Sequence, residues 1–333
     1  MTQADPTPIL DLIEAFRRSK VMFSAVSLGV FERLAGGPDD AYAVSLHLRS
    51  SEDSAARLLD ACVSLGLLEK RGTLYANSVL ATEYLLRGSP RTLAGYILYS
   101  DRVLYPMWAH LDDAVREGGH RWKQTFGLDG ALFSHFFRTD EDRRTFLLGM
   151  HGLGQMSSKA VAAVFDFSPY RRLVDLGGAT GHLAMAIAGR YPAMEAAVFD
   201  LPEVIDYARE FTEGSRVELI GGDFFSDPLP PADLYALGRI LHDWSEDKIE
   251  RLLARIYAAL PVGGALLIAE KLLDDDLAGP AGAHMQSLNM LICTEGRERS
   301  FAQYGALLNA AGFNEVRAET TGAPLDAVLA IKK

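Results

Sequence analysis

The chain has 333 residues and a mass of 36.3 kDa, enough for about two domains. Its formal net charge of -11 and pI of about 5.2 argue against a surface that neutralises nucleic-acid phosphates, because such surfaces depend on clustered lysine and arginine. Two cysteines make neither a disulfide framework nor a zinc quartet, and the sequence has no signal-peptide pattern and no run of 18 apolar residues, so we expect a cytoplasmic protein that binds neither nucleic acid nor a membrane.

The N-terminal part reads as helices followed by a hairpin. Apolar residues over 9–34 have the spacing of one or two amphipathic helices. A short helix, a turn at Ser50-Ser51 and a second helix over 55–65 come next, followed by a hairpin that turns at Arg71-Gly72. This order is that of a winged-helix module. Further helices rich in aromatic residues are expected between 90 and 165.

From residue 171 the pattern alternates between strands and helices, which predicts a mostly parallel sheet covered on both faces. The expected strands are 172–176, 196–200, 217–221, 234–239 and 265–270, and the expected helices are 182–190, 202–211 and 247–260. Two strands at 313–320 and 326–333 close the chain as a hairpin. We therefore expect an α/β fold with a Rossmann-like sheet and a terminal antiparallel hairpin, preceded by a mainly helical, winged-helix-like domain.

A glycine-rich loop, "VDLGGATGHLA", follows the first strand of this sheet. Small residues there let a ligand approach the backbone and the N-terminus of the next helix. The dinucleotide pattern G-x-G-x-x-G is not met, because Ala179 and His182 stand at the second and third glycine places. The form instead resembles the acid-x-Gly-x-Gly-x-Gly loop of methyltransferases that use S-adenosylmethionine (SAM). A turn that merely reverses the chain is the alternative.

Two more acidic residues end the next strands. Asp200 follows the loop at about the interval at which an acid accepts hydrogen bonds from ribose hydroxyls, although it could instead cap the next helix. Asp223 and Phe224 offer an acceptor and a flat apolar face that suit adenine; an ordinary acidic loop is the alternative. Together these residues line the carboxyl edge of the predicted sheet, where open α/β sheets bind ligands.

The motifs resemble, in the right order, those of small-molecule O-methyltransferases of the caffeic acid and acetylserotonin type, and most of all the acetylserotonin O-methyltransferase-like group. The motifs are "VDLGGATGHLA", "FDLPEV", "GGDFFSDPLP", "RILHDWSEDK", "GGALLIAEKLLDDD", "QSLNMLICTEGRERS" and "AGF", with "LLDACVSLGLLE" and "HLDDAVREG" in the N-terminal half. The resemblance covers nearly the whole chain. Two departures are Ala179, in place of a frequent glycine, and Arg239, where many plant members have lysine.

This resemblance implies SAM as cofactor and a two-fold homodimer whose N-terminal helices pack on the partner. It implies a dimerisation domain over 1–90, a helical connector over 91–165 that contributes to the substrate pocket, and a SAM-dependent catalytic domain over 166–333. The residues implied to bind SAM are Asp175, Gly177, Gly178, Asp200, Leu201, Asp223, Phe224 and Arg239.

The same resemblance gives His242 a catalytic role, since its imidazole can take the proton of an attacking hydroxyl. Glu270 and Glu298 are implied to flank and orient that histidine, although Glu298 could belong to a solvated turn. Asp243 either binds substrate or caps the helix that starts near Ser245. Beyond these residues we see no metal-ligand cluster and expect no metal requirement.

The implied substrate is a small phenolic or hydroxyindole-like molecule. Asn289 resembles a substrate-contacting asparagine, and its amide can bind an oxygen of a flat ring. Four apolar residues are candidates for a slot around that ring, with core packing as the alternative for each, and Trp244 is expected beside adenine or in the core. The four are Met285, Met290, Phe146 and Trp108.

The function expected is metal-independent transfer of the SAM methyl group to an aromatic hydroxyl, with His242 as general base. Two alternatives stay open. One is a SAM-binding relative with non-methylating chemistry in a natural-product pathway. The other is a SAM-sensing winged-helix protein that binds DNA, against which the acidic pI counts.

Overall fold

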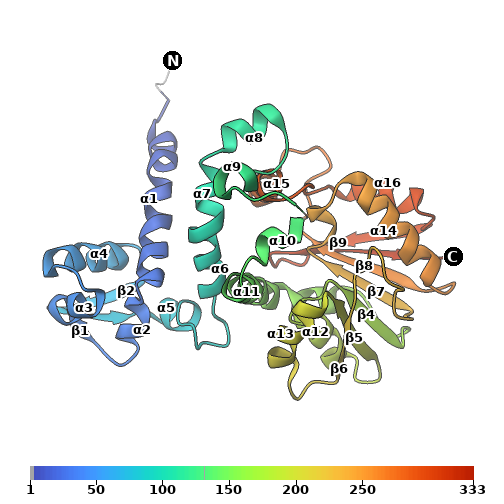
Figure 1. The fold of residues 1–333 in the computed structure, drawn as a ribbon, viewed down its shortest axis with the longest axis horizontal. Helices are drawn as coiled ribbons and strands as arrows, with labels where there is room; N and C mark the ends of the chain where they lie inside the picture. Colours follow the sequence, from blue (N-terminus) through green and yellow to red (C-terminus); the bar gives the residue numbers. More distant parts are fainter. Residues whose placement is uncertain (1–3, 131) are drawn as a thin grey trace. The chain divides into compact units, whose positions relative to one another are not determined.

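The computed structural model of the chain describes residues 4–130 and 132–333 (Figure 1). The fold has two compact units, which divide between Tyr105 and Pro106. The expected connector, residues 91–165, therefore has residues in both units. Within the described ranges, no helix is long and apolar enough to cross a bilayer.

The first unit is helical, with a small three-stranded sheet in the order β1-β3-β2. Its elements are α1 (Thr7–Ser27), α2 (Val30–Leu34), β1 (Asp39–Asp40), α3 (Ala41–Leu48), α4 (Glu52–Ser64), β2 (Leu68–Arg71), β3 (Leu74–Asn77), α5 (Val79–Tyr84), α6 (Ala94–Tyr99) and a π-helical turn, η1 (Ser100–Leu104). Strands β2 and β3 pair antiparallel, so the order of helix, turn, helix and hairpin is confirmed.

The first half of α1 exposes large apolar side chains, whereas its second half packs into the core of the unit. Toward its C-terminal end α1 enters the core through Val26, and Val30 and Phe31 of α2 are fully buried beside it. Toward its N-terminal end the apolar side chains are 52% to 73% exposed within the chain. They are Ile9, Leu10, Leu12, Ile13 and Phe16.

The second unit begins with short helices and then builds a seven-stranded sheet. Its helices are α7 (Tyr105–Trp108), α8 (Leu111–Glu117), α9 (Trp122–Phe126), α10 (Leu132–Phe136), α11 (Asp140–Val164), α12 (His182–Arg190), α13 (Pro202–Thr212), the 3-10 turn η2 (Leu241–Asp243), α14 (Glu246–Ala259), α15 (Ala281–Cys293) and α16 (Phe301–Ala310). Its strands are β4 (Arg172–Leu176), β5 (Glu195–Asp200), β6 (Val217–Gly221), β7 (Leu234–Gly238), β8 (Ala265–Glu270), β9 (Glu315–Glu319) and β10 (Asp326–Ile331).

The strand order is β6-β5-β4-β7-β8-β10-β9. Strands β4 to β8 are parallel, whereas β10 pairs antiparallel with both β8 and β9. Figure 1 shows helices on both sides of the sheet, with α12 and α13 on one side and α14 and α16 on the other. The expected Rossmann-like sheet with a terminal antiparallel hairpin is thus confirmed.

The strand order reverses between β4 and β7. From β4 the chain runs outward through β5 and β6, and it then returns to add β7 on the other side of β4. Parallel sheets of this kind bind ligands outside the carboxyl ends of the strands at such a reversal. The loop after β4 and the loop after β7 therefore meet where a ligand is expected.

The centre of the sheet is a continuous apolar core. Strand β8 is buried along its whole length, as is usual for a strand covered on both faces. The core includes Leu173, Ile187, Val198, Leu234 and Leu267, none of which is exposed. This rigid layer holds the loops at the carboxyl edge in fixed positions.

Candidate active site

Two glycines shape the loop after β4. Gly177 has a φ of +69°, and a Cβ atom there would lie 2.4 Å from Cδ1 of Ile240. A Cβ at Gly178 would lie 2.7 Å from the carboxyl group of Asp175. Side chains at these two positions would therefore displace the loop, which explains the glycines in physical terms.

Asp200, at the end of β5, holds this loop in place. Its Oδ2 accepts a hydrogen bond from the backbone N–H of Ala179 at 2.8 Å, and its Oδ1 accepts one from Leu201 N–H at 2.7 Å. Ala179 has a φ of +48°, a left-handed conformation that costs a non-glycine residue about 1 kcal/mol. Burial raises the pKa of Asp200 to about 6. The carboxylate thus clamps the loop, and further acceptor lone pairs remain on its oxygens.

Asp175 lies beneath the same loop and is 1% exposed. Neither of its carboxyl oxygens has a hydrogen-bond partner of normal geometry among the residues that the structure describes. Burial, together with the charge of Asp200, raises its pKa to about 7. Buried polar atoms are nearly always paired in folded proteins, so an orphaned acid beside a glycine loop fits a site whose ligand supplies the donor. The ammonium group of SAM is a donor of that kind.

The turn after β6 is ordered by Asp223. Its Oδ1 accepts from the backbone N–H of Phe225 at 2.8 Å, and its Oδ2 accepts from the hydroxyl of Ser226 at 3.1 Å. The ring of Phe224 comes within 3.3 Å of the place where a Cβ of Gly177 would stand. A half-buried aromatic face therefore lies directly beside the glycine loop.

Strand β7 leads into the segment that carries the histidine. Arg239 follows β7 with a φ of +57°, and its backbone N–H donates to Ala269 O at 3.1 Å. Burial raises the pKa of Asp243 to about 7, an effect that the positive charge of Arg239 opposes, and burial and the same charge both contribute to the lowered pKa of His182.

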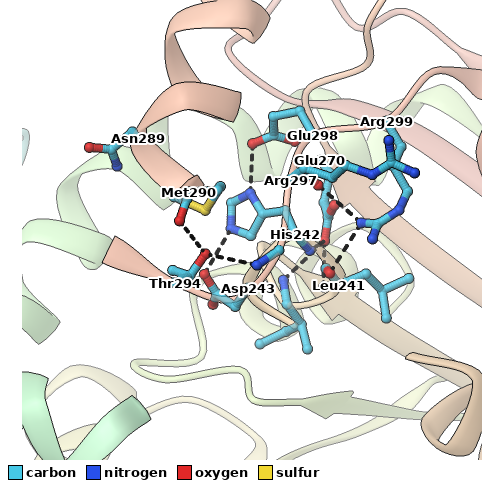
Figure 2. Close-up of polar contacts among 12 residues, drawn as sticks. Leu241, His242, Asp243, Glu270, Asn289, Met290, Thr294, Arg297, Glu298 and Arg299 are labelled. Atoms are coloured by element: carbon cyan, nitrogen blue, oxygen red, sulfur yellow. Dashed lines mark hydrogen bonds and ion pairs between the residues drawn. The ribbon is translucent and has the colours of Figure 1, made fainter. Parts of the chain in front are cut away.

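Glu270, at the end of β8, fixes the backbone around His242. Its Oε1 accepts hydrogen bonds from three consecutive backbone N–H groups, those of Ile240, Leu241 and His242, at 3.1, 2.7 and 3.2 Å. Figure 2 shows the carboxylate against this turn. The resemblance implied that Glu270 orients the imidazole, whereas its hydrogen bonds go to the backbone that bears it.

The imidazole of His242 is held by Glu298. Nδ1 lies 2.7 Å from Oε1 of Glu298, and Nε2 lies 3.7 Å from Oδ1 of Asp243 (Figure 2). Burial lowers the pKa of His242, but the carboxylates of Glu298, Asp243 and Glu270 outweigh that effect and raise it to about 10. The site therefore stabilises the protonated imidazole. Asp243 belongs to the 3-10 turn, and no hydrogen bond from its side chain to α14 is found among the described residues.

Tyr304 and Arg299 complete the buried surroundings of Glu270. The phenol of Tyr304, with no exposure, donates a short hydrogen bond to Oε2 of Glu270. Arg299 is 1% exposed, and its guanidinium donates to Leu241 O and to Glu246. Burial raises the pKa of Glu270, while the Tyr304 hydrogen bond and the Arg299 charge oppose that effect. Neither Tyr304 nor Arg299 was singled out from the sequence, since nothing local marks them.

Gly296 lets the segment that carries Glu298 approach the histidine turn. A Cβ atom there would lie 2.3 Å from the carbonyl oxygen of His242 and 2.7 Å from that of Trp244. The adjacent residue, Glu295, donates its N–H to Asp243 O at 3.1 Å and pairs with Lys248. These contacts bring Glu298 within reach of the imidazole.

The donor atoms of His242, Glu270 and Glu298 all lie within 4.8 Å of one another, so these three residues could also hold a metal ion. Both carboxylates already have other partners, however, although Oε2 of Glu298 has none among the described residues. Glu270 already accepts three backbone N–H groups and a phenol, and Glu298 accepts from the imidazole. The arrangement fits proton transfer better than metal coordination.

The structure brings two of the substrate candidates together. The indole N–H of Trp108 donates to Oδ1 of Asn289 at 3.0 Å, and Asn289 Nδ2 lies 3.6 Å from Sγ of Cys293. Phe146 packs against Phe136 with ring centroids 4.8 Å apart. Met290 is 4% exposed and Met285 is 52% exposed.

Trp244 lies in an aromatic cluster. Its ring centroid is 4.9 Å from that of Phe225 and 5.4 Å from that of Phe133, and it is 8% exposed. Its indole N–H is buried and has no partner among the residues described. Trp244 is therefore buried in an aromatic cluster, which is one of the two alternatives expected. Its contact with Phe225 places the ring against the turn after β6.

Comparison with known proteins identifies the family. Residues 108–314 match the O-methyltransferase domain, and residues 10–87 match the O-methyltransferase dimerisation domain. The chain belongs to the O-methyltransferase family. This O-methyltransferase is 46% identical to acetylserotonin O-methyltransferase of Bos taurus over 327 residues, which cover 95% of each chain. It is 42% identical to the Homo sapiens enzyme over 332 residues, covering 97% of this chain and 96% of the relative.

Solved structures agree with this assignment. The crystal structure of human N-acetylserotonin methyltransferase in complex with SAM superposes with a TM-score of 0.94 at 41% identity and covers 99% of both chains. The prediction of a SAM-dependent O-methyltransferase, with SAM as its cofactor, is confirmed.

Proposed function

We propose that this O-methyltransferase transfers the methyl group of SAM to the hydroxyl of a small hydroxyindole-like substrate, with His242 as general base. The observation that carries the proposal is the arrangement of Glu298, His242 and Asp243 beside the glycine loop. SAM, when bound, supplies a methyl group activated by the sulfonium charge. The chain's own residues must therefore position the acceptor and remove its proton.

The imidazole suits that proton transfer. Glu298 accepts from Nδ1–H, which leaves Nε2 as the base that takes the proton of the acceptor hydroxyl. The pKa of about 10 means that the surrounding carboxylates stabilise the imidazolium once it forms. Asp243 lies 3.7 Å from Nε2, beyond a hydrogen bond, and we propose that it contacts the substrate.

The carboxyl edge of the sheet is proposed to hold SAM along its length. Asp223 and Phe224 would receive the adenine, and Asp200 the ribose hydroxyls through its remaining lone pairs. The loop after β4 and the buried acid beneath it would receive the amino-acid part. The proposed cofactor residues are Asp175, Gly177, Gly178, Asp200, Leu201, Asp223, Phe224 and Arg239.

Two observations support a hydroxyindole-like molecule as the substrate that accepts the methyl group. The similar mammalian proteins are named for acetylserotonin, a flat hydroxyindole. In this chain the Trp108-Asn289 pair provides an amide and a broad aromatic face, which suit a planar ring that carries polar groups. Phe146, Met285 and Met290 are proposed to complete the apolar lining. The part of the connector that belongs to the second unit, residues 106–165, would thus supply Trp108 and Phe146.

We also propose that the protein is a homodimer. A match to the dimerisation domain covers residues 10–87, and the N-terminal half of α1 exposes a row of large apolar side chains. Contiguous apolar surface of this kind marks interfaces in soluble proteins. A second copy of the chain is the partner that the family match supports.

The test is product analysis with methyl-labelled SAM. The purified protein is incubated with N-acetylserotonin and with a panel of simple phenols and catechols, and the products are identified by mass spectrometry. We expect the label on the hydroxyl oxygen of N-acetylserotonin. Consumption of SAM without transfer of its methyl group would favour non-methylating chemistry, and methylation of the phenols alone would contradict the substrate class.

A further inference from the structure

His182 occupies a position at the cofactor edge to which no role was assigned. It is the first residue of α12 and directly follows the glycine loop after β4. Its pKa is lowered by burial and by the charges of His151 and Arg239, and Arg239 follows β7. As the first residue after the β4 loop, His182 stands at the carboxyl end of β4, next to β7, where the strand order reverses.

The ring fits there because α11 has a glycine opposite it. A Cβ atom at Gly154 would lie 2.2 Å from Nε2 of His182 and 2.3 Å from its Cε1. Any side chain at Gly154 would therefore displace the imidazole. His182 at the start of α12 and Gly154 in α11 are in direct contact, although 28 positions separate them in the sequence.

Ser158, one turn further along α11, sets the tautomer. Its hydroxyl donates to Gly154 O at 2.8 Å, and its Oγ also lies 2.8 Å from Nδ1 of His182. A hydroxyl has one proton, so Nδ1 must be the donor in the second contact. Nε2 is then an unprotonated acceptor. No hydrogen bond to Nε2 is found within residues 4–130 and 132–333, and the side chain is only partly buried.

The charge state agrees with this arrangement. Burial, His151 and Arg239 together lower the pKa of His182 to about 3, so the ring is neutral near pH 7. A neutral imidazole adds no positive charge to that of Arg239, and its unprotonated Nε2 can accept a hydrogen bond from a cationic donor. The carboxyl-edge assignments run from adenine at β6, through ribose at β5, to the amino-acid part at β4 and β7.

We propose that Nε2 of His182 accepts a hydrogen bond from the ammonium group of SAM, and that Gly154 and Ser158 position the imidazole for this contact. The inference rests on the proposed binding of SAM along the carboxyl edge and extends it to a residue outside that set. His182 is then a cofactor-binding residue, whereas the two α11 residues act through it.

Two ligands separate this contact from general damage to the loop. S-adenosylhomocysteine has the amino-acid part, and 5′-methylthioadenosine shares the nucleoside but lacks that part. By calorimetry, His182→Ala should weaken S-adenosylhomocysteine binding by about 10-fold or more, the effect of one hydrogen bond to a charged group. Its affinity for 5′-methylthioadenosine should stay within about two-fold of the native protein, because the nucleoside makes no contact with the ring.

The positioning roles are tested on α11. Ser158→Ala should weaken S-adenosylhomocysteine binding by about 2- to 10-fold, while the adjacent Ser157→Ala, which removes an equally buried hydroxyl, should leave it unchanged. Gly154→Ala should match His182→Ala in its loss of affinity. The double variant should lose no more than either single variant, because both changes remove the same contact.

An NMR measurement on the native protein tests the same contact without any substitution that could impair folding. In the native protein labelled with 15N-histidine, the Nε2 resonance of His182 should shift on addition of S-adenosylhomocysteine and stay in place with 5′-methylthioadenosine. Equal losses for both ligands in His182→Ala, or an Nε2 resonance that ignores S-adenosylhomocysteine, would overturn the inference while SAM binding stood. A native protein that binds neither ligand would overturn the proposed function itself.

Discussion

Glu298 and His242 lie 56 positions apart in the sequence, and the structure brings Oε1 of the acid within 2.7 Å of Nδ1 of the imidazole. Both side chains are almost completely buried. This contact leaves Nε2 as the nitrogen of the proposed base, and it raises the pKa of the ring. The carboxylate favours the protonated ring, so the neutral form that starts the reaction is favoured at high pH.

The pH dependence of turnover should show this coupling. In the native enzyme kcat/KM should rise with pH toward the His242 pKa of about 10. Glu298→Gln removes a charge that stabilises the imidazolium and therefore lowers the pKa, so the rising limb should move to lower pH. The plateau should fall by about ten-fold or more, because the product of proton transfer loses a charged hydrogen bond. Superimposable pH profiles for the two proteins would contradict the assigned pairing.

Removal of the base should separate catalysis from cofactor binding. His242→Ala should lower turnover by roughly 10² to 10⁴, the usual contribution of a general base. SAM affinity, measured by calorimetry, should be nearly unchanged, because the proposed cofactor contacts lie on other residues. Chelator treatment of the native enzyme should leave its rate unchanged. A rate that collapses with chelator and returns with a divalent metal would point to coordination by His242, Glu270 and Glu298 instead.

Asp200 should matter for SAM binding. Asp200→Ala removes the proposed ribose acceptors and also the clamp on Ala179 N–H, so SAM affinity should weaken by about ten-fold or more. Asp206→Ala is the matched control, since that acid is exposed on the neighbouring helix α13. Equal affinities for the native protein and the Asp200 variant would remove this residue from the site.

Gly296 should tolerate no side chain. Gly296→Ala places a methyl group 2.3 Å from the His242 carbonyl, so either the histidine turn or the Glu298 segment must shift. We expect a loss of about 1 to 3 kcal/mol in the free energy of unfolding, typical of overpacking, together with a fall in turnover. Gly305→Ala, in the middle of α16 with open space around it, is the control and should be neutral or slightly stabilising. Thermal unfolding and initial rates measure both effects.

The proposed dimer should depend on the exposed face of α1. Light scattering at micromolar concentration should give a particle near twice the chain mass of 36.3 kDa. Leu12→Glu combined with Phe16→Glu should split it, because these side chains are 73% and 52% exposed within one chain and need another surface to cover them. Deletion of the first 34 residues is a harsher change, since it also removes buried core residues such as Phe31. A monodisperse, active native monomer would refute the dimer.

Much of the fold could be predicted from local patterns. The strand "RLVDL" was expected at 172–176, and β4 has those bounds, because a short apolar run between turn residues leaves few alternatives. The helix expected at 182–190 likewise matches α12, which begins where the glycine loop ends. The carboxyl-edge positions of Asp200 and Asp223 followed from the same alternation of strands and helices.

The sequence alone determined the order of the elements, the family, and which acids end which strands, because these depend on periodicity and on residues close together in the chain. The tertiary structure decided that Glu270 bonds the backbone of the histidine turn, whereas Glu298 bonds the ring. It also decided that Gly154 makes room for His182. Those contacts join residues 28 to 56 positions apart, and they form only when packed helices and strands bring distant segments to one edge.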